Sequence, residues 1–318
     1  MWIYLILFAV LLGLELLYFQ VADRYNIIDK PNERSSHSRI TLRGGGVIFY
    51  FGALLYFIVY GGAFPFFMLG LTLITLISFV DDVRSVSRSL RLAVQFSAML
   101  LLFYQWGLFT EFPWWYLLVA LIVCTGIINA YNFMDGINGI TGGYSLVVLA
   151  ALAYINQAVV SFTDSALIAT VICAVLVFNL FNFRTRAKCF AGDVGSVSIA
   201  FIILFLLGQL ILKTSDLSYI ILLAVYGVDS VLTIIHRLWL KENIFDAHRK
   251  HAYQLLANEL GWKHIAVSSF YMILQAGIVA GYLTLGQNSP WLYLAASIIV
   301  LSLAYLLFMK KYFKLHQA

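Results

Sequence analysis

Four short polar segments interrupt an otherwise apolar chain, and their residue types suit metal and phosphate chemistry. The first is the pair Asp81 and Asp82, which directly follows the apolar run 77–80. Neighbouring carboxylates repel each other, and a divalent cation relieves that repulsion. Mg²⁺ prefers one or two carboxylates together with water and substrate phosphate oxygens. The pair therefore predicts a magnesium and phosphate site, although a solvated helix end paired with Arg84 or Arg88 would contain the same residues.

The second segment, residues 129–143, contains four glycines and four Asn or Asp side chains. Buried polar groups need hydrogen-bond partners, so Asn132, Asp135 and Asn138 predict the lining of a wet cavity. Close helix packing would explain the glycines but not the amides and the acid. The spacing does not match a calcium-binding EF-hand loop, which requires a terminal Glu.

The third segment, residues 179–196, contains Asn182 and Phe190 and places Asp193 between two glycines at the start of an apolar run. Glycines allow the backbone to approach a ligand closely, so Asp193 is a candidate metal ligand. A carboxylate in this position is also a common helix N-cap. The spacing alone leaves both interpretations open.

The fourth segment is His248-Arg249-Lys250-His251. On a helix, His248 and His251 would share one face. Paired histidines can bind zinc, but no third ligand lies at a recognised spacing and the H-E-x-x-H motif is absent. The mixture of His, Arg and Lys suits an anionic diphosphate better.

These segments lie at the ends of long apolar stretches. The chain is 62% hydrophobic and 11% charged, with a mean hydropathy of +0.91. A membrane-spanning helix needs roughly 20 mainly apolar residues. The sequence therefore predicts an all-α, polytopic transmembrane helical bundle of about 10–11 spans. The candidate stretches, several of them short, are 1–20, 45–60, 64–80, 92–106, 114–130, 139–156, 165–182, 194–212, 218–236, 265–285 and 291–308.

The cationic residues predict the orientation of this bundle. Nineteen of the twenty Lys and Arg residues lie in alternate gaps between the apolar stretches, and only Lys213 does not. Basic loops stay in the cytoplasm, so the four polar segments, which lie in the same gaps, predict an active site at the cytoplasmic face. No clustered basic domain suggests nucleic-acid binding. The three cysteines have no metal-like spacing and suggest no disulfide framework.

Together the four motifs resemble those of the polyprenyl-phosphate N-acetylhexosamine-1-phosphate transferases. This superfamily, glycosyltransferase family 4, includes the undecaprenyl-phosphate GlcNAc-1-phosphate transferases and phospho-MurNAc-pentapeptide translocase. The resemblance covers nearly the whole chain, with all four motifs in the same order and on the same predicted side of the membrane. It implies a single integral-membrane transferase domain over residues 1–318, located in a bacterial inner membrane.

The resemblance also implies a reaction. An N-acetylhexosamine-1-phosphate, with GlcNAc-1-phosphate as the default, would move from a UDP-sugar to undecaprenyl phosphate and release UMP. Mg²⁺, with Mn²⁺ as a substitute, would be the cofactor, and the transfer would initiate a cell-envelope glycan. The lipid phosphate would attack directly, or through a covalent enzyme intermediate. A homodimer is compatible with this reaction.

By position in the motifs, Asp193 and Asp82 would bind the metal, and Asp81 and Asp82 would act on the lipid phosphate. His248 and His251 would act near the diphosphate and sugar. Phe190 would stack on uracil, within a nucleotide-binding set that also contains Asn132, Asp135, Asn138, Asn182 and Arg249. Many members have Asp where this chain has Asn138. Asp229 matches a polar residue near the ninth span, where it would support the site or form a structural pair.

One alternative belongs to a different class of protein. A secondary transporter or lipid scramblase could use the same acids as cation or proton sites. It would place them near the bilayer midplane, on interrupted helices. In this chain the principal acids lie at the ends of spans, which favours an enzyme at the membrane surface.

Overall fold

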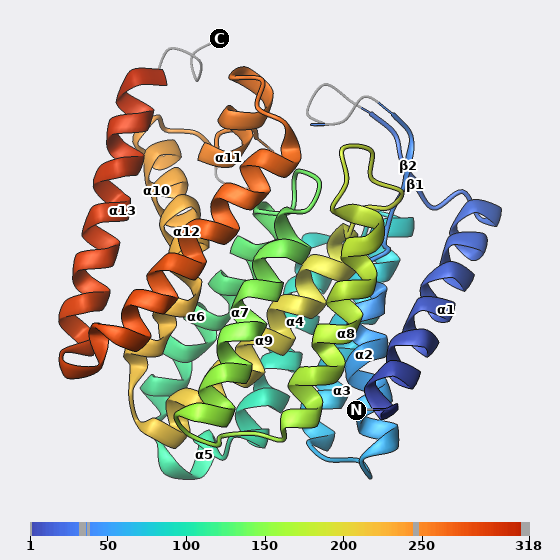
Figure 1. Ribbon diagram of the computed structural model, residues 1–318, viewed down its shortest axis with the longest axis horizontal. Helices are drawn as coiled ribbons and strands as arrows, with labels where there is room; N and C mark the ends of the chain where they lie inside the picture. The colour runs from blue at the N-terminus through green and yellow to red at the C-terminus, as the bar shows by residue number, and fades with distance from the viewer. Residues whose placement is uncertain (1, 32–35, 37–38, 244–247, 313–318) are drawn as a thin grey trace.

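The computed structural model describes residues 2–31, 36, 39–243 and 248–312, and within them it is an all-α, polytopic membrane bundle (Figure 1). Each predicted apolar stretch coincides with a helix. The long helices are α1 (Trp2–Arg24), α2 (Val47–Val59), α3 (Pro65–Val83), α4 (Arg88–Gln105), α6 (Trp114–Phe133), α7 (Ile140–Ala158), α8 (Ser165–Asn182), α9 (Gly192–Thr214), α10 (Ala224–Trp239, preceded by η1, Leu217–Leu223), α12 (His264–Thr284) and α13 (Pro290–Tyr312).

Nine of these helical segments in the described chain are long and apolar enough to cross a membrane. The two remaining stretches differ for separate reasons. Helix α2 has only 13 residues, which span about 20 Å at 1.5 Å per residue, less than the hydrocarbon thickness of about 30 Å. Helix α4 begins with Arg88 and contains Arg91 in its first turn. The polytopic class is therefore confirmed, with nine clear spans and two weaker ones.

The polar segments gather at one end of the bundle. The loops after α6 and α8, the segment after α10 and the short antiparallel pair β1 (Ile28–Asp29) and β2 (Thr41–Leu42) all lie at the end where α13 finishes (Figure 1). The first helix begins at the opposite end. This arrangement matches an odd number of crossings.

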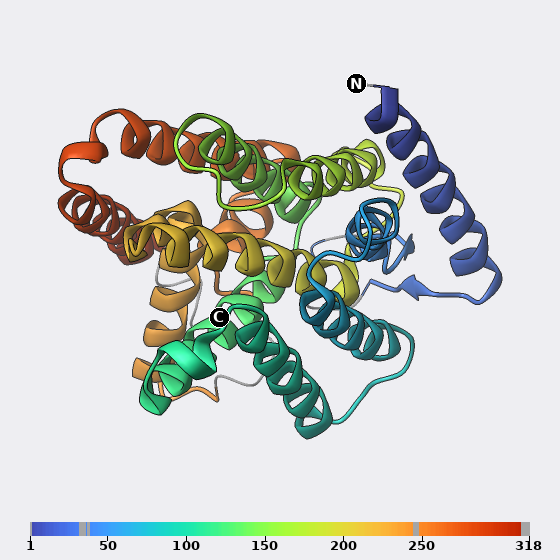
Figure 2. The same cartoon turned by 90° about the horizontal axis from the view of Figure 1, so that it is seen from below.

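Helix α9 forms the centre of the bundle. It is the most buried of the nine candidate spans, with 83% of its apolar window inside the protein. Helices α2, α3, α6 and α7 pack around it (Figure 2). At its first turn α9 meets the start of α2 through two glycines: a Cβ on Gly46 would lie 2.3 Å from the Gly195 Cα. This close approach fixes the start of α9, where Asp193 lies, next to the loop before α2.

Candidate active site

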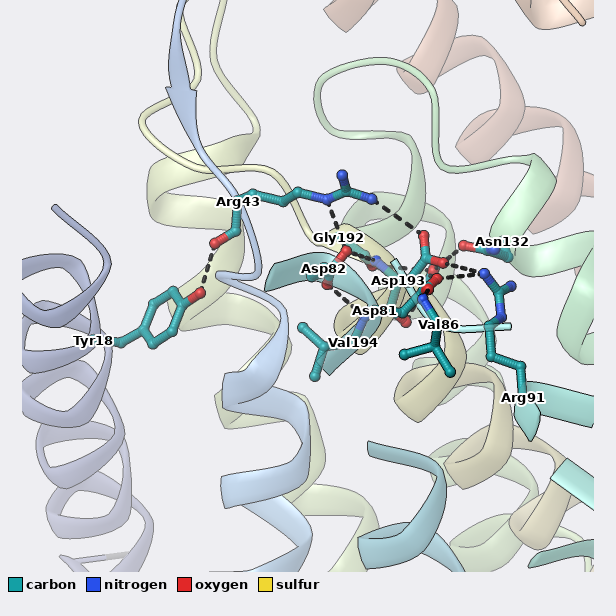
Figure 3. Close-up of polar contacts among 11 residues, drawn as sticks. Tyr18, Arg43, Asp81, Asp82, Val86, Arg91, Asn132, Gly192, Asp193 and Val194 are labelled. Carbon is teal, nitrogen blue, oxygen red and sulfur yellow. Dashed lines mark hydrogen bonds and ion pairs between the residues drawn. The ribbon is translucent and has the colours of Figure 1, made fainter. Parts of the chain in front are cut away.

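Three acids and two arginines from four elements meet at the polar end of the bundle (Figure 3). Asp81 and Asp82 lie in the last turn of α3, and Asp193 lies in the first turn of α9. Arg43 comes from the loop before α2, and Arg91 comes from the first turn of α4. The structure thus brings together the first and third polar segments, as the sequence predicts.

Asp82 is bound on both carboxylate oxygens, and its side chain is fully buried. Oδ1 accepts from the Asp193 backbone N–H at 3.0 Å and pairs with the Arg43 Nε at 2.7 Å, while Oδ2 accepts from the Val194 N–H at 2.9 Å. These N–H groups belong to the first turn of α9, which has no intrahelical acceptor for them. Asp82 therefore acts as the N-cap of a helix 111 residues further along the chain.

Gly192 allows this cap to form. Its φ of +71° lies in the left-handed region, and a Cβ there would lie 2.5 Å from the Asp82 Oδ2. Any larger residue would therefore collide with the carboxylate while adopting an unfavourable backbone conformation.

The two arginines connect the acids. The Arg91 Nη1 bonds to the Asp81 Oδ2 and lies 3.1 Å from the Asp193 Oδ2. The Arg43 Nη2 lies 3.6 Å from the Asp193 Oδ1, in addition to the bond from its Nε to Asp82. Asp81 also accepts from the Val86 N–H at 2.7 Å. Three carboxylates with two guanidinium groups leave one negative charge uncompensated, which is suited to a cation.

The acids fit a magnesium site of limited protein ligation. Among the described residues no group of three or more His, Cys, Asp and Glu side chains is arranged to hold a metal ion. Mg²⁺ does not require such a cage, because phosphate oxygens and water complete its shell. Asp193 and Asp81 share one arginine and remain partly accessible, with side-chain exposures of 18% and 12%. Asp82 has three donors and no such access, so the geometry favours Asp193 with Asp81.

A polar cavity of about 620 Å³ opens beside the acids. Its wall combines residues of the second and fourth polar segments with the arginines of α4. Those that bear on the chemistry are Asn132, Asp135, His248, His251, Arg88 and Arg91. Arg91 thus faces both the cavity and the carboxylates. The predicted nucleotide-side and histidine motifs therefore line one space next to the predicted metal site.

Asn132 and Asp135 are held from the side away from the cavity. The Asn132 Oδ1 accepts from the Ser196 Oγ at 2.7 Å, and the Asp135 Oδ1 accepts from the Thr141 Oγ1 at 2.6 Å. Burial raises the pKa of Asp135 to about 7, and the nearby charges of Asp193 and Asp82 act in the same direction. Asp135 can therefore exchange a proton near neutral pH.

Asn138 and Asn182 connect loops and do not face the cavity. The Asn138 Nδ2 donates to the Arg184 carbonyl at 2.9 Å. The Asn182 carboxamide accepts from the Gly139 N–H at 2.7 Å and donates to the Cys189 carbonyl at 2.8 Å. Both side chains are buried. These contacts position the loops after α6 and α8. The motifs had predicted that both residues belong to the nucleotide-binding set.

The remaining predicted residues lie around the same end of the bundle. Phe190 is half-buried; its N–H donates to the Leu42 carbonyl, and its carbonyl accepts from the Gly45 N–H. Arg249 is also half-buried and does not line the cavity. Burial lowers the pKa of His248 to about 3, with His251 and Arg237 adding to the effect. His248 is therefore a neutral group at physiological pH.

Arg43 and Arg91 were not predicted as site residues. Basic residues in the gaps between spans usually set the orientation of a protein in the membrane. That interpretation does not distinguish Arg43 and Arg91, which bind acids, from the other cations. Their positions contain a signal in retrospect: Arg43 precedes three glycines, and Arg91 follows Asp81 by ten residues, at the start of the next helix. Neither signal specifies a partner.

Comparisons with known proteins agree with this geometry. The model of glycosyl transferase family 4 matches residues 64–210, from α3 to α9. Over these residues the chain is similar to glycosyl transferase family 4. The matched region contains Asp81, Asp82 and Asp193, together with the loop residues Asn132 to Asn138, so the resemblance inferred from the motifs is confirmed.

Curated relatives extend the similarity beyond the family 4 region. A protein of Yersinia pestis is 28% identical over 260 residues, covering 74% of this chain and 71% of the relative. A protein of Escherichia coli O157:H7 is 27% identical, and the match covers 91% of this chain and 84% of the relative. Both are named undecaprenyl-phosphate alpha-N-acetylglucosaminyl 1-phosphate transferase. A Bacillus subtilis protein, named as a probable enzyme of this type, is 26% identical over 80% of this chain and 76% of its own.

Proposed function

We propose that this chain is a family 4 enzyme that transfers an N-acetylhexosamine-1-phosphate from a UDP-sugar to undecaprenyl phosphate, giving undecaprenyl-diphosphate-sugar and UMP. GlcNAc-1-phosphate is the default group, as in the names of the relatives. The observation that supports this most is the junction of the carboxylate cluster and the polar cavity, with Arg91 belonging to both. The product would initiate a cell-envelope glycan.

The chemistry requires positioning and charge neutralisation more than a strong base. A phosphate monoester has its second pKa near 6, so the lipid phosphate is largely ionised at neutral pH. Its oxygen attacks the β-phosphorus of the UDP-sugar, a new P–O bond forms, and the bond to the bridging oxygen breaks as UMP leaves. Negative charge accumulates on the phosphate oxygens in such transfers. Arg43 and Arg91 lie where they can balance it.

Asp193 and Asp81 would hold Mg²⁺, or Mn²⁺ in its place, and the bound ion would supply further charge neutralisation. Asp82 keeps Asp193 in place through the first turn of α9. The cavity lined by Asn132 and Asp135 would receive the nucleotide. The histidines on its other wall would face the diphosphate and sugar.

The site would lie at the cytoplasmic face of a bacterial inner membrane. The polar end of the bundle is also the end where α13 finishes with Lys310 and Lys311, and basic segments remain in the cytoplasm. UDP-sugars would then reach the cavity from the cytosol, and the lipid phosphate from the adjacent leaflet. The transporter or scramblase alternative requires acids near the midplane, whereas these acids lie in the last turn of α3 and the first turn of α9.

The test is release of UMP by the purified protein in detergent, with undecaprenyl phosphate, Mg²⁺ and a panel of UDP-N-acetylhexosamines. We expect release that depends on lipid and is lost with a chelator and in Asp193→Asn. The matched control is Asp23→Asn, which makes the same change at an exposed position at the end of α1 and should leave release unchanged. Folded protein that releases no UMP from any donor, yet moves lipid between leaflets of a vesicle, would favour the scramblase.

A further inference from the structure

A second buried carboxylate, outside the metal cluster, organises the histidine motif. Asp229 lies on α10 with 3% exposure. Its Oδ1 accepts from the Ala252 N–H at 3.0 Å and the Thr233 Oγ1 at 3.2 Å. Its Oδ2 accepts from the Tyr271 hydroxyl at 2.6 Å and the Tyr253 N–H at 3.4 Å. Because these donors come from α10, the short helix α11 (Ala252–Gln254) and α12, Asp229 holds α11 against α12.

The same carboxylate meets the imidazole of His251. The His251 Nδ1 lies 3.3 Å from the Asp229 Oδ1. The Gln254 N–H also approaches the His251 side chain, in a capping box, but it has a main-chain acceptor in the His251 carbonyl at 3.0 Å. Hydrogen bonds to an ionised acceptor are about twice as strong as neutral ones. The contact with Asp229 therefore favours a proton on Nδ1.

The other ring nitrogen of His251, a residue of the cavity wall, has no partner among the described residues. Nε2 is buried and has no hydrogen-bond partner within the described residues, and the side chain is 2% exposed. His251 lines the cavity together with His248, whose ring centroid is 5.0 Å away. An unpartnered buried polar atom is costly, so its orientation indicates that a bound group completes it.

We propose that Asp229 positions His251 for the transfer: its carboxylate accepts the Nδ1 proton, fixes the ring, and leaves Nε2 at the cavity wall as an acceptor for a hydroxyl or N–H group of the substrate. Assigning that group to the sugar nucleotide rests on the proposed function. The positioning itself does not. Asp229 is thus a positioning residue that acts through His251.

Other polar groups lie around His251 and are part of the test. Arg237 and His248 line the same cavity, with Asp135 and Arg91, while Tyr253 and Tyr271 bond to Asp229. Apart from the Gln254 N–H of the capping box, only Asp229 bonds to the ring among the contacts of the described residues, so its replacement is the most selective change.

The first experiment needs no substrate. The protein is labelled with ¹⁵N-histidine, and the ring nitrogens are observed by NMR in detergent at neutral pH, with His251→Gln identifying the His251 signals. We expect a protonated Nδ1 in the unmodified protein and loss of this preference for Nδ1 in Asp229→Asn. Tyr271→Phe is the matched control, because it removes one hydrogen bond to Asp229 but keeps the charge and the Nδ1 contact. It should preserve the Nδ1 proton.

The second experiment measures UMP release. Loss of the contact between the Asp229 carboxylate and the Nδ1 proton should lower kcat/KM about 10- to 150-fold in Asp229→Asn, the range for hydrogen bonds to charged groups. The double substitution with His251→Gln should cost little more than His251→Gln alone.

Two results would overturn the inference. One is a proton on Nε2 with a bare Nδ1 in the unmodified protein. The other is an unchanged preference of the proton for Nδ1 in folded Asp229→Asn. The expected NMR result without UMP release from any donor would instead count against the proposed function and leave the positioning intact.

Discussion

Replacing Gly192 with Ala should disable the site by displacing Asp193, although the change adds only one methyl group. The added Cβ would lie 2.5 Å from the Asp82 Oδ2 and 3.0 Å from the Gly44 N. Asp82 cannot retreat easily, because Arg43 and the α9 N–H groups hold both of its oxygens. The left-handed backbone costs a non-glycine residue roughly 1–2 kcal/mol, and loss of a charged hydrogen bond about 1.5–3 kcal/mol.

Together these penalties amount to about 2.5–5 kcal/mol, enough to reduce the population of the intact cap by at least about 60-fold. The assay is UMP release by the variant, alongside its melting temperature in the same detergent. We expect a large loss of release and a lower melting temperature.

Gly126→Ala is the matched control. Gly126 lies within α6, and a Cβ there meets nothing within 4 Å, so the variant should match the unmodified protein in both measurements. If Gly192→Ala behaved like Gly126→Ala, the Asp82 cap would not be needed to hold Asp193, and the description of the cluster would be wrong.

Three further changes test other parts of the site. Asn182→Ala removes the acceptor of the Gly139 N–H and should cost about 1–3 kcal/mol, measured by melting; an unchanged melting temperature would contradict the loop-connecting role. Arg91→Gln leaves Asp81 and Asp193 without their shared cation and should reduce UMP release at least about tenfold. Unchanged release would show that Arg91 does not balance charge in the reaction. Burial raises the pKa of Asp135 from 3.8 to about 7, so the folded protein keeps a proton that the unfolded chain loses, and stability falls as pH rises through this window. Metal-free Asp135→Asn should flatten that dependence, and an equally steep decline would refute the assignment.

The sequence predicted the helices well, because a membrane span has a strong compositional signal. Apolar runs of about 20 residues are typical of helices that cross the hydrocarbon, and every predicted stretch coincides with a helix. The motifs also predicted which segments would meet. Asp82 and Asp193 are far apart in the chain, but both lie at helix ends that the charge pattern placed on one side of the membrane.

The sequence could not predict how the polar side chains divide their roles. Asp81 and Asp82 are adjacent and chemically identical, yet one faces the cluster and the other caps α9. The difference depends on the packing of α3 against α9, a contact between distant segments with no local pattern. Asn138 and Asn182 have the composition of ligands, but their amides bond to backbone groups of neighbouring loops. Only the tertiary structure distinguishes these uses.

The cap that Asp82 provides for α9 also has a consequence for synthesis in the cell. Asp82 and the N–H groups that it binds are separated by 111 and 112 residues. At about 5–20 residues per second, the ribosome makes Asp82 roughly 6–22 s before those groups exist. During that interval α3 must enter the bilayer with two acids at its end. Arg43 is made earlier than either acid, so it can already pair with Asp82 in the nascent chain. The N–H groups of α9 replace water around the carboxylate later, when that helix has been made.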